Sequence, residues 1–170
     1  MRDLLKYAAV ICAIMMLTIL NADAKNKTAV MPGSHYWDID NQRFGKSDTA
    51  DFLWTFGTEN NGCFRTVNSA KMAMVRNFSF DKINLSIIRA QNLIEGRAYT
   101  VRDGHIQPGT VIAFQTAEGK YGRLEILGFR SSHDFAFKEA ANLPEKWKKF
   151  ALKKPEIKAY HLEVKWRLFE

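Results

Sequence analysis

Two aspartates near the beginning of the chain have a spacing that could support chemistry. Asp38 and Asp40 are two residues apart, so on an extended strand their carboxylates point to the same side. Paired carboxylates can hydrolyse glycosides or bind calcium. The stretch that follows adds only Asn41 and Gln42 as oxygen donors, and an Asp40–Asn41 turn accounts for the same residues. We therefore predict a turn here, and a hydrolytic site would need a cleft that brings Asp38 or Asp40 to Asp51.

A second pair lies at the end of the chain. His161 and Glu163 are also two residues apart and could begin a metal or acid–base site. Zinc catalysis requires three protein ligands, and no third donor is tied to this pair by spacing. We expect a solvated strand face instead. Cys63 has no local catalytic signature and no G-x-S-x-G elbow is present, so we predict neither catalytic nor metal-binding residues and no cofactor.

The least ordinary segment is basic and predicted to be helical, over residues 134–154. Pro144 suits a first helical turn, Trp147 and Phe150 fall on one face, and Pro155 ends the pattern. Such a helix could bind an anionic membrane surface, or it could pack its aromatic face on a sheet while its lysines stay solvated. Both alternatives leave a positive patch. The candidate partner-binding residues are Lys146, Trp147, Lys149, Lys153 and Lys154.

Strands must position most of these residues. Apolar and polar residues alternate from Tyr160 to Leu168, which predicts a strand with one dry face. Residues 110–116 and 120–127 predict a hairpin closed at Gly119. Further strands are predicted at 35–40, 51–56, 63–67, 70–76 and 97–102, and a helix at 83–94. The fold class is therefore all-β, mainly an antiparallel sandwich or barrel-like, with one or two short helices including the basic insertion near 134–154.

The hairpin carries a resemblance. The run PGTVIAFQTAEGKYGRLEI from Pro108, followed later by LEVKWRL from Leu162, resembles a largely uncharacterised family of exported bacterial β-domains with a G-T-V-x-x-x-x-T-x-E-G-x-Y hairpin. The hairpin is also distantly similar to that of HmuY-type hemophores, which implies an all-β fold that grasps haem with two axial histidines. Neither axial histidine can be matched to a histidine of this chain, so the resemblance implies fold more than function.

The first residues predict export. Arg2 and Lys6 precede the apolar run from Tyr7 to Leu20, and Ala22-Asp23-Ala24 offers a cleavage site, so residues 1–24 read as a signal peptide. We expect a flexible leader at 25–33 and a single β-rich domain at 34–170, periplasmic or secreted, without a transmembrane segment after cleavage. The formal net charge of the chain is +7. Outside the cytoplasm that charge favours anionic lipid, polysaccharide or acidic protein as partner, and nucleic acid is not expected.

These observations favour a non-enzymatic, exported binding module of the bacterial envelope that recognises an anionic partner through a basic surface. Two alternatives stay open. The first is a small-ligand carrier of the haem-binding kind, which predicts a pocket with His or Met near its mouth. The second is a hydrolase that acts on envelope polymers, so whether the chain is an enzyme is not decided by its sequence.

Overall fold

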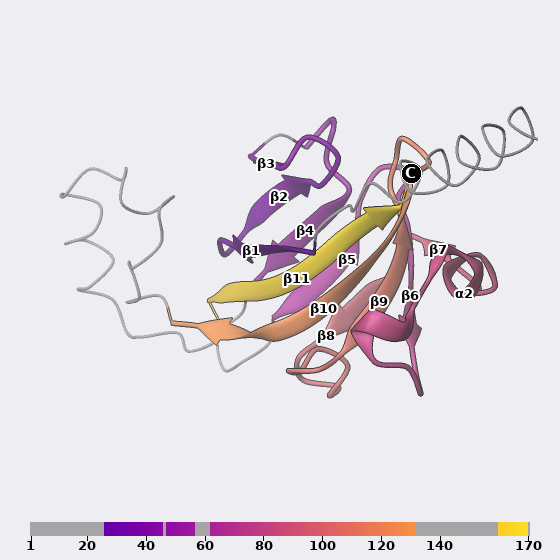
Figure 1. Ribbon diagram of the computed structural model, residues 1–170. Helices are drawn as coiled ribbons and strands as arrows, with labels where there is room; N and C mark the ends of the chain where they lie inside the picture. Colours follow the sequence, from indigo (N-terminus) through magenta and orange to yellow (C-terminus); the bar gives the residue numbers. More distant parts are fainter. Residues whose placement is uncertain (1–25, 46, 57–61, 132–159, 170) are drawn as a thin grey trace, which may run out of the picture.

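A computed structural model describes residues 26–45, 47–56, 62–131 and 160–169, and these residues form two antiparallel β-sheets packed face to face (Figure 1). The six-stranded sheet has the order β1-β11-β10-β9-β6-β7, and the five-stranded sheet has the order β3-β2-β4-β5-β8. The sequence-based prediction of a mainly antiparallel all-β fold is confirmed, and its sandwich alternative is the one that fits.

Each strand predicted from alternation has a counterpart in the structure. The six-stranded sheet contains β1 (Lys27–Met31), β6 (Lys71–Val75), β7 (Ile94–Glu95), β9 (Val111–Gln115), β10 (Tyr121–Arg130) and β11 (His161–Phe169). The five-stranded sheet contains β2 (His35–Asp38), β3 (Arg43–Phe44), β4 (Phe52–Thr55), β5 (Cys63–Thr66) and β8 (Ala98–Thr100). Two short helices, η2 (Phe80–Lys82) and α2 (Leu85–Arg89), complete the described elements.

The flexible leader expected at 25–33 is wrong for most of its length. Strand β1 occupies Lys27–Met31 and pairs with β11, from Lys27 opposite Trp166 to Met31 opposite Leu162. Met31 is fully buried, which anchors the strand to the sandwich. A single strand of five residues shows too little alternation for its period to be recognised in the sequence.

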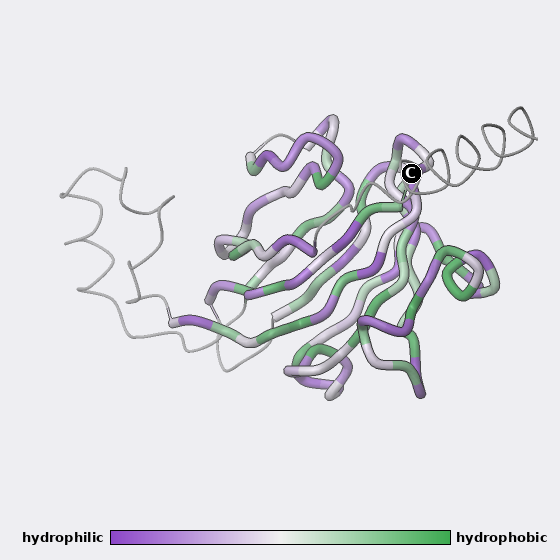
Figure 2. Tube along the Cα trace, viewed as in Figure 1, coloured by the Kyte–Doolittle hydropathy of each residue, from purple (hydrophilic) through white to green (hydrophobic). Residues whose placement is uncertain are grey.

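Aromatic side chains join the inner faces of the two sheets. Trp37 of β2 meets Trp166 of β11 edge to face with ring centroids 5.7 Å apart, and Phe52 of β4 meets Phe114 of β9 in the same way at 5.2 Å. Edge-to-face contacts of this kind stabilise aromatic pairs beyond the area they bury. Hydrophobic and hydrophilic residues alternate along β10 and β11, as Figure 2 shows, so one face of these strands belongs to the core.

A small helical layer covers the outer face of the six-stranded sheet. Ile83 and Ile88 pack there against Val111 and Ala113 of β9. Asn84 caps α2 by accepting a hydrogen bond from the amide of Ile87 at 3.0 Å. The helix predicted at 83–94 is therefore confirmed only over Leu85–Arg89, and strand β7 takes the end of that range.

The long connection between β10 and β11 begins and ends at neighbouring positions. The amide of Tyr160 donates to the carbonyl of Arg130 at 3.1 Å, and the Arg130 guanidinium pairs with Glu163 on β11. The predicted basic helix at 134–154 lies outside the described residues, as does the predicted signal peptide. Among the residues that the structure does describe, no helix has the length and apolar character needed to cross a membrane.

Candidate binding groove and acidic cluster

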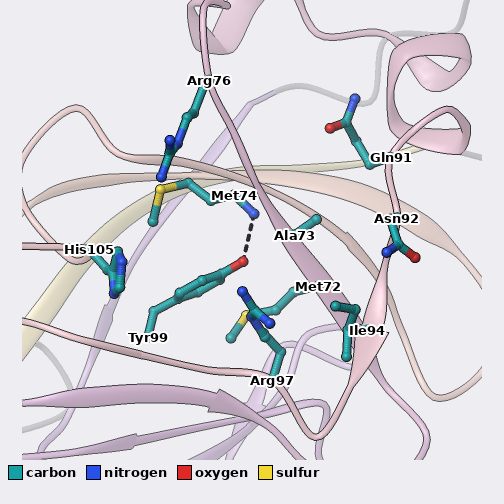
Figure 3. Close-up of a pocket in the computed structure, with 10 residues that line it drawn as sticks. All are labelled: Met72, Ala73, Met74, Arg76, Gln91, Asn92, Ile94, Arg97, Tyr99 and His105. Carbon is teal, nitrogen blue, oxygen red and sulfur yellow. Dashed lines mark hydrogen bonds between the residues drawn. The ribbon is translucent and has the colours of Figure 1, made fainter. Parts of the chain in front are cut away.

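A groove opens where the two sheets part, along the edge formed by β6 and β7 on one side and β8 on the other (Figure 3). Its volume is about 330 Å³, which is at the lower end of the range typical of small-ligand sites. Ten residues line it: Met72, Ala73, Met74, Arg76, Gln91, Asn92, Ile94, Arg97, Tyr99 and His105.

The groove is cationic. Arg76 follows the end of β6 and Arg97 precedes β8, so the two guanidiniums come from different sheets. Both arginines are exposed, and none of the ten lining residues is an aspartate or glutamate. Guanidinium groups form paired, charge-assisted hydrogen bonds with carboxylates and phosphates. The groove is therefore suited to an anionic group.

A tight loop holds His105 at the groove. The hydroxyl of Thr100 donates to Asp103 at 2.6 Å and accepts from the Asp103 amide at 3.1 Å. Gly104 then takes a positive φ of 70°, a conformation that glycine adopts without strain. The hydroxyl of Thr110 donates to the carbonyl of His105 at 3.0 Å and fixes the far end of the loop.

The amide-bearing wall of the groove follows α2. The side-chain nitrogen of Gln91 donates to the carbonyl of Ile87 at 3.0 Å, which ties Gln91 to the last turn of the helix. Asn92 comes next and is exposed. Amide groups here add hydrogen-bonding capacity that is not tied to charge, so the groove can contact hydroxyl or carbonyl groups as well as an anion.

Three aspartates converge at a second place in the sandwich. Asp38, Asp40 and Asp51 can each place one carboxylate oxygen within 4.8 Å of the others. Asp38 and Asp51 are 6% and 1% exposed, and the side chain of Asp40 is 3% exposed. The juxtaposition that a hydrolase would need is thus present, but these carboxylates lie inside the fold.

Each aspartate of this cluster has a structural contact. Asp51 accepts from the backbone amides of Ile39 at 2.9 Å and Ala117 at 2.7 Å. Asp38 accepts a hydrogen bond from the amide of Asn41 at 2.9 Å and closes the turn after β2. The turn predicted at Asp40–Asn41 is therefore present, and the carboxylate that closes it belongs to Asp38. These contacts use the carboxylates to hold the backbone, and a buried carboxylate engaged in this way is poorly placed to meet a polymer substrate.

The electrostatics of the cluster follow from its burial. Burial raises the pKa of Asp51 from 3.8 to about 6, the two backbone hydrogen bonds oppose that rise, and nearby Asp40 and Asp38 add to it. Lys120, on the β9–β10 hairpin, places its ammonium 2.9 Å from Asp40. Hydrogen bonding to Asp40, then to Glu118, raises the pKa of Lys120. The cluster therefore fastens the hairpin to the end of β2.

His161 and Glu163 do not form a site together in the structure. Glu163 pairs with Arg130, whereas His161 is 7% exposed and lies edge to face with Tyr160 at 4.6 Å. The solvated strand face expected for His161 is therefore wrong, because the ring is covered at this end of β11. Cys63 is a half-buried free thiol, and burial raises its pKa.

The partner-binding residues predicted from the sequence all lie in the basic segment: Lys146, Trp147, Lys149, Lys153 and Lys154. They fall outside the described residues, so their role stays a prediction. Sequence reasoning missed Arg76, Arg97 and His105. No local spacing connects these three residues, because the pairing of distant strands brings them to one groove.

Comparison with known proteins yields little. No family model matches the chain, and no curated protein matches it. Among solved structures, apo PinO from Porphyromonas gingivalis is a distant neighbour with a TM-score of 0.38 and 14% sequence identity, over 86% of this chain and 98% of that chain.

Proposed function

We propose that this chain is an exported, non-enzymatic binding module that recognises an anionic partner through a basic surface, and that the groove between β6 and β8 is part of that surface. The observation that carries the proposal is the pair Arg76 and Arg97, which flank strands of two different sheets around a groove whose ten described lining residues include no aspartate or glutamate. An anion that contacts both arginines gains two charge-assisted contacts and bridges the two sheets.

The overall charge and the first residues support the same proposal. A net charge of +7 attracts anionic partners and speeds their association with the protein. Salt limits the distance over which this attraction acts. Export through the predicted signal at residues 1–24 would bring the domain to an envelope rich in anionic lipid and acidic polysaccharide. The lysines of the predicted basic segment, Lys146, Lys149, Lys153 and Lys154, would then form a second cationic surface on the same domain.

Binding to three anionic probes tests the proposal. Residues 25–170 are mixed with phosphatidylglycerol vesicles, with oligogalacturonate and with polyglutamate at low and physiological salt, and the dissociation constants are measured. We expect the double substitution Arg76→Gln and Arg97→Gln to weaken binding of at least one probe about tenfold or more, since each hydrogen bond to a charged group contributes roughly 1.5–3 kcal/mol.

Two further variants separate the groove from other charges. The double substitution Arg43→Gln and Arg65→Gln removes two exposed arginines outside the groove and should leave binding within about twofold, because surface charges that touch no ligand contribute little. Charge reversal of Lys146, Lys149, Lys153 and Lys154 measures how much the basic segment contributes to the affinity for each probe. Equal binding by the wild type and the Arg76/Arg97 variant would refute the role of the groove.

A second candidate function is a haem-like ligand carrier, and one observation favours it. His105 and the half-buried Met74 line the same groove as Arg76 and Arg97. Imidazole and thioether groups ligate haem iron, and guanidinium groups pair with carboxylates such as those of a porphyrin. Titration with haemin tests this candidate. A Soret shift that is lost in His105→Ala or Met74→Leu would support it, and a spectrum equal to that of free haemin would exclude it.

A further inference from the structure

The edge of β6 at the groove is closed by a side chain from the other sheet. Strand β7 pairs with β6 only through Lys71 and Met72. Two residues further along, the amide of Met74 points away from β9 and donates to the hydroxyl of Tyr99 at 2.9 Å (Figure 3). Tyr99 stands on β8, so this hydrogen bond links the two sheets along the groove.

The ring of Tyr99 also organises two charged or titratable lining residues. The Arg97 guanidinium lies 5.4 Å from the ring centroid, and the His105 ring lies 5.7 Å away at an interplanar angle of 63°. Figure 3 shows Tyr99 between these two side chains, with its hydroxyl directed at β6. The residue itself is only 6% exposed, so it can act on a ligand mainly through its neighbours.

These contacts have a consequence for the kind of partner. A peptide that adds as an extra strand needs free backbone amides and carbonyls along an edge. The Met74 amide is already bonded to Tyr99, so the groove side of β6 is blocked at that position. The functional groups that remain at the groove are side chains: two guanidiniums, two amides and an imidazole. Such a set suits a compact acidic group surrounded by hydroxyls better than an extended peptide.

We infer that Tyr99 is the positioning and specificity-determining residue of the groove, and that it directs the groove toward an acidic saccharide unit and away from a peptide strand. This inference rests on the proposed function, because it names the class of anion that the groove takes. The sugar carboxylate contacts Arg76 and Arg97, and the side chains of Gln91, Asn92 and His105 contact the sugar hydroxyls. Tyr99 holds Arg97 and His105 in place and keeps the Met74 amide occupied.

The Tyr99→Phe substitution tests the inference, because it keeps the ring and removes the hydroxyl. The probes are a galacturonate trimer and a peptide of alternating valine and glutamate. We expect the wild type to bind the trimer at least about tenfold more tightly than the peptide, and the variant to bind the peptide about tenfold more tightly than the wild type does. Affinity for the trimer should stay within about threefold, since Arg97 and His105 keep the ring beside them.

Hydrogen exchange of the Met74 amide provides a readout that does not depend on any ligand. We expect exchange to be about tenfold faster or more in Tyr99→Phe, because the amide loses its acceptor. Tyr36→Phe removes a tyrosine hydroxyl from β2, away from the groove, and should change neither exchange of Met74 nor binding of either probe. Unchanged Met74 exchange in Tyr99→Phe, or tighter binding of the peptide than of the trimer by the wild type, would overturn the inference.

The two proposals fail in different ways. If Arg76→Gln with Arg97→Gln weakens binding of the trimer while Tyr99→Phe changes neither peptide binding nor Met74 exchange, the inference about Tyr99 is wrong and the groove keeps its function. If the arginine substitutions change no binding, the proposed function of the groove is wrong, and the saccharide specificity inferred from it is wrong as well.

Discussion

Asp51 accepts a hydrogen bond from the amide of Ala117 at 2.7 Å, although 66 residues separate the two along the chain. Asp51 immediately precedes β4 of the five-stranded sheet, and Ala117 lies in the turn between β9 and β10 of the six-stranded sheet. The same carboxylate also accepts a hydrogen bond from the amide of Ile39, which follows β2. One buried side chain therefore fastens the two sheets together beside the β9–β10 turn.

Replacing this carboxylate should destabilise the fold. In Asp51→Ala, the amides of Ile39 and Ala117 lose their acceptor, and each unsatisfied buried group costs roughly 1–3 kcal/mol, offset in part by relief of repulsion from Asp38 and Asp40. We expect the free energy of unfolding to fall by about 2–4 kcal/mol in urea titrations. Asp48→Ala, at an exposed position in the same loop, is the matched control, and an equal effect of both substitutions would contradict the role given to Asp51.

The raised pKa of Asp51 makes its contribution to stability depend on pH. Because burial raises the pKa from 3.8 to about 6 in the folded state, protonation favours folding. This contribution is fully present below about pH 3.8 and is lost as the pH rises through about 6, with an upper bound of about 3 kcal/mol for a shift of this size. The difference in unfolding free energy between the wild type and Asp51→Asn, measured from pH 4 to 7.5, should therefore decrease as the pH rises. A difference that is constant or increases would show that Asp51 does not titrate in this window.

Two glycines on β10 should respond very differently to substitution by alanine. A Cβ on Gly122 would lie 2.2 Å from Cζ of Phe114 and 2.8 Å from the carbonyl oxygen of Arg167, whereas a Cβ on Gly128 would meet nothing closer than 3.8 Å. Phe114 is fully buried and cannot move freely. We expect Gly122→Ala to lower the free energy of unfolding by about 1–3 kcal/mol and Gly128→Ala to change it by less than about 0.5 kcal/mol. Similar thermal unfolding of both variants would contradict the packing around β10.

The sequence predicts most of the strands because alternation in β10 and β11 is long and regular. Strand β1 cannot be predicted in this way, because its five residues show no clear alternation and the strand is defined by its pairing with β11. The short α2 is similarly determined by its packing on β9 rather than by the longer apolar pattern of 83–94. Local pattern thus predicts an element well when one face is buried along its whole length.

The candidate groove depends on tertiary structure in a way that spacing cannot reveal. Arg76 and Arg97 line one groove only because β6, which the two-residue edge strand β7 covers in part, and the edge strand β8 of the other sheet both border it. For Asp38, Asp40 and Asp51, the sequence analysis named the three carboxylates that come together in the structure. The spacing of these residues does not show that the carboxylates are buried or that Asp51 binds two backbone amides, and both facts depend on the packing of the two sheets.

Isothermal titration of residues 25–170 with the galacturonate trimer, in the wild type and in the Arg76→Gln, Arg97→Gln double variant, measures directly whether the two arginines bind an acidic saccharide. If Arg76 and Arg97 hold the acidic group, the wild type binds the trimer saturably and the variant loses about tenfold or more in affinity, while the Arg43→Gln, Arg65→Gln control stays within about twofold of the wild type. Identical titrations for all three proteins would show that the groove does not bind the trimer through Arg76 and Arg97.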